Sequence, residues 1–177
     1  MAEPWPAIEA LQTRRLSLEP LRVEDATEMA DVLSGQELYS HTGGSPPTAA
    51  DLRERYERQV RGVSADGSRG WFNWVLRLRG DGLAGYVQAT VAPAGPELSA
   101  DLAWVIGRRR QGEGLASEAA SAVAAWLTAN GVGTLTAHIA PANAASCAVA
   151  RRLGMVPTGE VRDGEDRWLV RAPGVGR

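Results

Sequence analysis

The most informative part of the chain is the apolar run Leu102-Ala-Trp-Val-Ile106 together with the turn Gln111-Gly-Glu-Gly-Leu-Ala116 that follows it. The run predicts a β-strand, and apolar residues at helical spacing after the turn predict a long amphipathic helix. Glycines at such a turn let the backbone approach a ligand closely. The start of the helix adds unpaired N–H donors and the positive end of a dipole, so the segment predicts a pyrophosphate-binding turn. A tight connection between strand and helix, without a ligand, is the alternative.

A second segment supports ligand binding. It runs from Asn143 to Met155, after a strand-like run over 134–140. Together the two segments resemble the GNAT superfamily of acyl-coenzyme A N-acyltransferases. The resemblance rests on an acetyl-CoA signature, Gln/Arg-x-x-Gly-x-Gly/Ala, and on a later pattern, Asn-x-x-Ser followed by Leu-Gly-Phe/Met. The matching residues are Gln111, Gly114 and Ala116 for the signature, and Asn143, Ser146, Leu153, Gly154 and Met155 for the later pattern.

The layout of the chain from residue 14 to residue 171 resembles the branch of the family that contains the ribosomal-protein N-terminal alanine acetyltransferases. The resemblance implies a single α/β (α+β) domain over residues 13–172, with a mixed, mostly antiparallel sheet and helices on both faces. Polar and proline breaks predict a loose arm over residues 1–12. The resemblance also implies acetyl-CoA as the cosubstrate and a primary amine as the acceptor.

Periodicity along the chain gives the expected elements. Alternating apolar residues predict strands, and apolar residues three and four apart predict helices. Gly80-Asp-Gly82 predicts a hairpin, and Thr48 with Asp51 predicts a capped helix start. Strands are expected over 14–21, 71–79, 82–91, 97–106, 134–140 and 167–171, and helices over 25–33, 48–63, 114–130 and 143–153.

Composition and charge restrict the function. The 177 residues suffice for one domain with a substantial core, and the formal net charge of −2 gives no electrostatic footprint for nucleic acid. The single cysteine, Cys147, excludes an internal disulfide framework, and His41 and His138 are too few and too far apart to indicate a metal site. No signal-peptide pattern and no membrane-length apolar run is visible. We expect a soluble cytoplasmic protein, monomeric or homodimeric, without metal, nucleic acid or membrane partners.

The expected donor site has four parts. The resemblance implies that the peptide groups of Trp104, Val105 and Ile106 bind the pantetheine arm. Arg109 and Arg110 are candidates for counter-charges to the phosphates, with a solvated turn as the alternative. Asn143 is expected to cap the helix that follows it, to bind the pantetheine, or to do both. The turn itself contributes Gln111, Gly112, Glu113, Gly114, Leu115 and Ala116.

Asp101 is the first candidate catalytic residue. Amide formation from a thioester needs a neutral amine, and most primary amines are protonated at neutral pH. A carboxylate inside an otherwise apolar strand needs a reason to be there, and taking this proton is one. In the branch that the chain resembles, the pattern Ala-Glu-Ile-Gly-Tyr carries the proposed base, and here it reads Ala100-Asp-Leu-Ala-Trp104. The shorter side chain favours transfer through a bridging water, and a structural carboxylate is the alternative.

Ser146 is the second candidate. It is expected in the first turn of a helix, where the positive local potential suits a hydroxyl that donates to a leaving thiolate. The resemblance assigns this serine to the cofactor thiol, as hydrogen-bond donor or general acid. The alternative is a serine that completes a helix cap with Asn143.

The acceptor side is expected to use Tyr39 and His41 from the loop over 34–48, and Trp71 and Trp74, although the two tryptophans are also candidates for the core. A predicted acidic loop over 159–166 would attract a cationic amine or simply be solvated. Two acceptor classes stay open, the N-terminus of a protein and a small amine. An open groove would favour the first class, and a closed pocket of aromatic residues the second. A module that binds CoA without catalysis is the alternative from another class.

Overall fold

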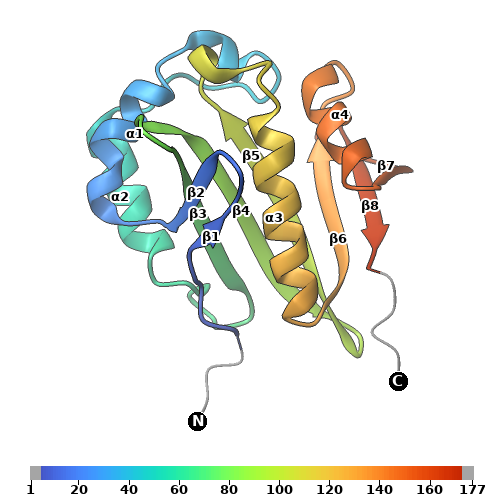
Figure 1. Cartoon of the computed structure of the whole chain (residues 1–177). Helices are drawn as coiled ribbons and strands as arrows, with labels where there is room; N and C mark the ends of the chain where they lie inside the picture. Colours follow the sequence, from blue (N-terminus) through green and yellow to red (C-terminus); the bar gives the residue numbers. More distant parts are fainter. Residues whose placement is uncertain (1–4, 173–177) are drawn as a thin grey trace.

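A computed structural model of the protein describes residues 5–172, which form one eight-stranded sheet with helices on both faces (Figure 1). The strand order is β1-β2-β3-β4-β5-β6-β8-β7, and all neighbouring pairs are antiparallel except β5 and β6. The expected single-domain α/β fold with a mostly antiparallel sheet is confirmed. The strands are β1 (Leu11–Gln12), β2 (Leu16–Pro20), β3 (Gly70–Leu78), β4 (Leu83–Ala94), β5 (Glu97–Ile106), β6 (Val132–Ile139), β7 (Val156–Arg162) and β8 (Glu165–Arg171). The α-helices are α1 (Ala26–Val32), α2 (Ala49–Gln59), α3 (Leu115–Ala129) and α4 (Ala144–Arg152).

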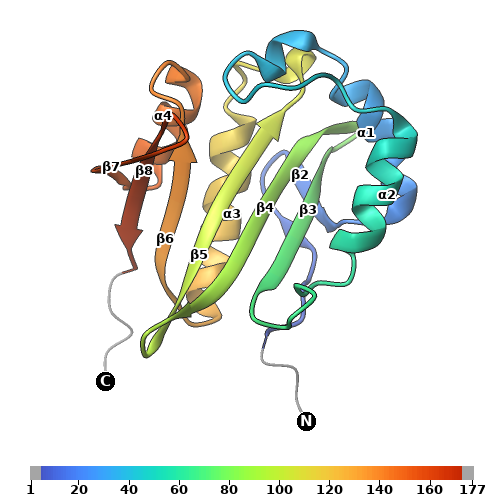
Figure 2. The same ribbon diagram turned by 180° about the vertical axis from the view of Figure 1, so that it is seen from behind.

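The helices divide the core into two parts. α3 packs on one face against β5 and β6, and α4 lies beside it, whereas α1 and α2 cover the other face at β3 and β4 (Figures 1 and 2). Under α3, the rings of Phe72, Trp74 and Trp126 lie with centroids 5.3 to 6.2 Å apart. Each such aromatic pair contributes about 0.5–1.5 kcal/mol beyond its burial. Met29 and Leu52 belong to the smaller cluster under α1 and α2.

The apolar periodicity of α3 explains its position. Leu115, Ala119, Val123 and Trp126 recur at intervals of three or four residues and are all buried. The helix begins after Gly114, which has φ of 78°, a conformation that glycine adopts without strain. Packing of the apolar side on the sheet therefore holds the N-terminus of α3 close to the end of β5.

Residues 5–12 differ from the predicted loose arm, and residues 1–4 lie outside the described residues. Leu11–Gln12 forms β1 against β2. Glu9 accepts hydrogen bonds from two indole N–H groups, with its carbonyl from Trp74 at 2.9 Å and with its carboxylate from Trp126 at 2.6 Å. Buried indole N–H groups need partners, and these residues supply them.

The predicted acidic loop over 159–166 is wrong, because this segment belongs to a hairpin of β7 and β8. Every side chain of β7 is exposed, so the strand has no alternation of apolar and polar residues. Pro157 and Gly159 are also residue types that strands rarely contain. The pattern of the sequence therefore gave no signal for β7.

β5 and β6 pair at one end and separate toward the other. They pair from Leu98 to Asp101 on β5 and from Val132 to Thr136 on β6, whereas β4 stays paired with β5 as far as Ile106. Figure 2 shows the two strands diverging toward the end where α3 and α4 begin. The edge of β5 over residues 102–106 therefore has backbone groups without a strand partner on that side, and an extended ligand can pair with them.

Candidate active site

A cavity of 470 Å³ lies where β5 and β6 separate. Its size is within the usual range for small-molecule sites, roughly 300–1,000 Å³. It is lined by the loop with the 3-10 turn η2 (Gln36–Tyr39), the end of β5, the turn into α3 and the first turns of α4. The predicted residues in the lining are His41, Trp104, Val105, Ile106, Arg110, Gln111, Gly112, Gly114, Leu115, Ala116, Asn143 and Ser146. The predicted residues outside it are Tyr39, Trp71, Trp74, Asp101, Arg109 and Glu113.

The turn before α3 suits a phosphate group. Gly112 and Gly114 have φ of 79° and 78°, and nothing lies within 4 Å of the place that a Cβ would take at Gly112. Gly114 has no side chain to cap α3, so first-turn N–H groups beside the cavity have no side-chain acceptor from the cap position. The side-chain amide of Gln111 donates to the carbonyl oxygen of Ile106 at 3.1 Å, which closes the turn onto β5. Its side chain thus has a structural role that the sequence did not indicate.

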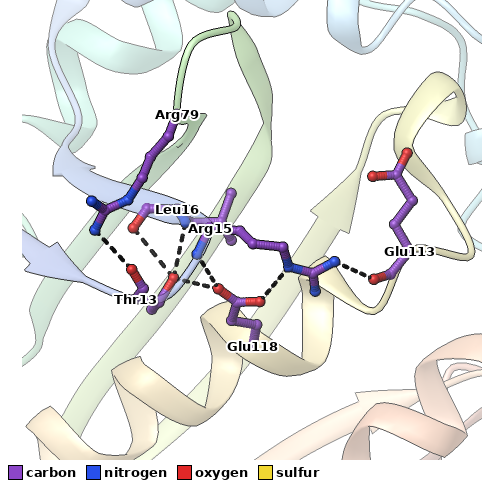
Figure 3. A network of polar contacts seen from close by, with 6 residues as sticks. All are labelled: Thr13, Arg15, Leu16, Arg79, Glu113 and Glu118. Carbon is purple, nitrogen blue, oxygen red and sulfur yellow. Dashed lines mark hydrogen bonds and ion pairs between the residues drawn. The ribbon is translucent and has the colours of Figure 1, made fainter.

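A polar network holds this turn against the segment between β1 and β2, residues 13–15 (Figure 3). Glu118, in the first turn of α3, accepts hydrogen bonds from the Thr13 hydroxyl at 2.6 Å, the Arg15 backbone N–H at 2.8 Å and Arg15 Nε at 2.7 Å. Arg15 also donates to the carbonyl of Glu113 at 2.8 Å. Burial raises the pKa of Glu118, but these hydrogen bonds and the charge of Arg15 outweigh it and lower the pKa below 4.5. Arg15 and Glu118 are 103 residues apart in the sequence, so no local pattern joins them.

The three arginines before the turn have different surroundings. Arg108 pairs with Glu37 at 3.2 Å. Arg110 lines the cavity and pairs with Asp81 and, at 3.7 Å, with Glu113. Arg109 is exposed and outside the cavity lining. Of the two predicted counter-charges, Arg110 is therefore the one that the structure brings to the cavity.

α4 brings two predicted residues and one unexpected residue to the cavity. The side-chain oxygen of Asn143 accepts the backbone N–H of Ser146 at 3.1 Å, so the cap uses the backbone of the serine and not its hydroxyl. The half-buried Ser146 side chain lines the cavity at the positive end of the helix dipole. Arg152 lines it too, since Ser146, Val149 and Arg152 share one side of the helix. That spacing of three was a signal for Arg152 in the sequence.

Asp101 lies at the last pair between β5 and β6, where the two strands separate. Its neighbours Ala100 and Leu102 belong to the core under α3, so Asp101 points to the opposite face of the sheet and is 49% exposed. Oδ1 of Asp101 accepts the Thr136 hydroxyl at 2.9 Å and lies 3.2 Å from Nδ1 of His138. This position, beside the opening between the separating strands β5 and β6, suits a residue that accepts a proton. The contact with His138 was not predicted, because the sequence does not give the register of β6 against β5.

The predicted acceptor residues do not form one pocket. Trp74 is completely buried under α3, and its indole N–H is bound by Glu9, so it has the contacts of a core residue. Trp71 lies on the other face, in the same cross-strand row as Asp101. His41 is exposed and lines the cavity of 470 Å³. The hydroxyl of the half-buried Tyr39 donates to the carbonyl of Leu33 at 3.0 Å, and burial raises the pKa of Tyr39.

Comparison with known proteins identifies the family of the chain. The model of the acetyltransferase (GNAT) domain matches residues 15–156. The chain therefore belongs to the GNAT acetyltransferase family, and it is an N-acetyltransferase that uses acetyl-CoA. No curated protein matches the sequence.

Solved structures share the fold at low sequence identity. Ribosomal-protein-S5-alanine acetyltransferase from Vibrio fischeri is 17% identical with a TM-score of 0.76, over 93% of this chain and 96% of that chain. A GNAT-family acetyltransferase from Bacillus anthracis is 18% identical with a TM-score of 0.72, over 92% and 98%. The aminoglycoside acetyltransferase AAC(6')-Ib, solved with coenzyme A, is 19% identical with a TM-score of 0.71, over 88% and 94%. Proteins with different acceptors thus share this fold.

Residues 5–172 hold no group of three or more His, Cys, Asp or Glu side chains that could bind a metal ion. Within the same residues, each helix is too short or too polar to cross a membrane.

Proposed function

We propose that the protein transfers the acetyl group of acetyl-CoA directly to a primary amine, and that the N-terminus of a polypeptide is its preferred acceptor. The observation that carries this proposal is the separation of β5 and β6 beyond Asp101. A cavity with the features of a CoA site lies at this opening, and on the side away from α3 the exposed residues Asp101 and Ala103 of β5 lie beside it. Donor and acceptor would therefore meet at the opening in one ternary complex.

Two residues are proposed for the chemistry. Asp101 provides the carboxylate on the acceptor side, where the ammonium group must lose its proton before attack. Ser146 provides a hydroxyl on the donor side, where negative charge develops on sulfur as the thioester breaks. The free hydroxyl at the N-terminus of α4 supports this role for Ser146, since the helix cap leaves it available.

The openness of the acceptor side favours a polypeptide over a small amine. A small-molecule site is usually an enclosed pocket, and the aromatic residues expected to enclose one are spread over both faces of the sheet. Asp101 and Ala103 are instead exposed on one face, with Thr90 and Trp71 across the neighbouring strands. An extended chain end could reach Asp101 across this face.

An acceptor screen tests the proposal by following free-thiol release from acetyl-CoA. The acceptors are a lysine-free peptide with a free alanine N-terminus, the same peptide with a blocked N-terminus, an aminoglycoside and a polyamine. We expect the free peptide to give the highest kcat/KM and the blocked peptide to give none. A higher kcat/KM for the aminoglycoside or the polyamine would move the acceptor to the small-amine class. Binding of acetyl-CoA without thiol release for any acceptor would favour a CoA-binding module without catalysis.

A further inference from the structure

His138 is a titratable residue at the opening that the proposed chemistry does not yet use. It lies on β6 two residues beyond Thr136, the last residue of β6 that pairs with β5. Residues two apart on a strand share a face, so His138 and Thr136 point to the side of Asp101. Nδ1 of His138 lies 3.2 Å from Oδ1 of Asp101, and the histidine side chain is 29% exposed. The imidazole therefore borders the opening and can be reached by a ligand.

The carboxylate of Asp101 has contacts that suit it to orient a neighbouring side chain. Its Oδ1 already accepts the Thr136 hydroxyl at 2.9 Å and faces His138. Carboxylates are weak bases at neutral pH, whereas an imidazole is well matched to proton transfer there. A carboxylate bound to one nitrogen of an imidazole orients the ring and stabilises its protonated form, and it leaves the other nitrogen free to accept a proton.

The charged groups around His138 come from three strands. Asp101 faces it from β5, and Arg167 is its cross-strand partner on β8. The guanidinium group of Arg167 pairs with Glu160 of β7 at 3.0 Å, so its charge is partly balanced. Asp101 is the carboxylate that contacts the imidazole, so it can accept a hydrogen bond from Nδ1–H and fix the orientation of the ring.

We propose that His138 is the group that takes the proton from the acceptor ammonium, and that Asp101 positions His138. This rests on the proposed N-acetyltransferase function and assigns its base. With the Nδ1 proton directed to Asp101, the Nε2 lone pair accepts one proton from the ammonium group. The neutral amine then attacks the thioester carbonyl, a C–N bond forms and the C–S bond breaks. The electron pair of the broken bond goes to sulfur, beside Ser146, and the remaining excess proton of the former amine neutralises the thiolate.

The activity test uses His138→Gln, Asp101→Asn and the double variant in the full chain, with Asp31→Asn as the matched control. Asp31 is an exposed carboxylate of α1. The peptide with a free alanine N-terminus is the acceptor. We expect His138→Gln to lower kcat about 100-fold, the scale of general base catalysis, and to remove the acidic limb of the pH–rate profile. The double variant should be within about threefold of His138→Gln, because the two residues act as one unit.

Two outcomes overturn the inference. A His138→Gln variant within about threefold of the parent, beside a large loss in Asp101→Asn, makes Asp101 the direct base. Losses that multiply in the double variant show two independent residues. In either case the parent still releases thiol, whereas a parent that acetylates no amine contradicts the proposed function itself. Equal acetyl-CoA affinity of all variants by calorimetry separates this effect from damage to the donor site.

A measurement on the protein alone tests the positioning role of Asp101. Nitrogen NMR of the His138 ring reports which nitrogen carries the proton. We expect the proton on Nδ1 in the parent and in Asp31→Asn, and a shift toward the other tautomer in Asp101→Asn. A tautomer that does not respond to Asp101→Asn would contradict the positioning role.

Discussion

Gly112 combines an unusual backbone conformation with empty space around it. Its φ is 79°, and no atom lies within 4 Å of a Cβ placed there. Gly112→Val should therefore cost about 1–2 kcal/mol of backbone strain and leave the fold intact, while its side chain fills space at the phosphate turn. We expect acetyl-CoA to bind at least about tenfold more weakly by calorimetry.

The control for this change is Gly131→Val. Gly131 has φ of 89°, equal freedom around its Cβ position and a place at the far end of α3. It should show similar strain without loss of acetyl-CoA affinity. Equal affinities of the two variants would contradict the assignment of the turn over 111–116 to the pyrophosphate.

A substitution at Ser146 can distinguish a binding role of its hydroxyl from a catalytic role. Its backbone N–H takes part in the helix cap and its hydroxyl does not, so Ser146→Ala should keep the cap intact. We expect kcat to fall about ten- to a thousandfold, with a much smaller change in acetyl-CoA affinity, because the hydroxyl acts on charge that develops as sulfur leaves. Ser121→Ala, at an exposed position of α3, is the control and should leave both values unchanged. An equal loss of affinity and rate in Ser146→Ala would assign the hydroxyl to binding.

Glu118 connects the start of α3 to Thr13 and Arg15, before β2. The folded protein lowers the pKa of Glu118 below 4.5, so folding favours its ionised form. The stability that this gives is present above pH 4.5 and is lost as the pH falls through the lowered pKa. We expect Glu118→Gln to lower the free energy of unfolding at pH 7 by about 1–2 kcal/mol, measured by urea titration, because it removes hydrogen bonds to a charged group.

Glu57→Gln is the control that shows whether the loss of stability comes from the polar network around Glu118. Glu57 is an exposed carboxylate of α2 and should leave stability unchanged. The difference between Glu118→Gln and the parent should shrink in acid. A difference that stays constant down to pH 2 would show that the ionised carboxylate is not the source of the stability.

The elements that the sequence predicted well are those with a repeated apolar pattern. α3 begins at Leu115 and ends at Ala129, against an expected 114–130, and β5 has its expected bounds. β7 lacked such a pattern because its side chains are all exposed. β1 was too short to show one, with only Leu11 and Gln12. A strand that buries no side chain, or that is only two residues long, leaves little trace in the order of its amino acids.

For the molecule as a whole, local motifs pointed to residues that line one cavity, but not to the contacts across the sheet. The turn over 111–116 and the start of α4 line one cavity, and its assignment to acetyl-CoA stays a prediction. The pairs Arg15–Glu118 and Asp101–His138 join residues that are far apart in sequence, and they depend on the register of the strands and the packing of α3. Trp74 was misplaced for a similar reason, since alternation puts it on the opposite face from Trp71 but does not say which of the two faces α3 covers.

The loss of pairing between β5 and β6 beyond Asp101 has a consequence for how such a protein can change. Acetyl-CoA would be bound by a turn and two helix ends on one side of the sheet. The amine would be recognised by strand side chains such as Trp71 and Thr90 on the other side. The two recognition surfaces share the opening and little else. Substitutions on the acceptor surface could then alter the choice of amine while acetyl-CoA stays the acetyl donor. A single scaffold could in this way serve many different amines over evolutionary time.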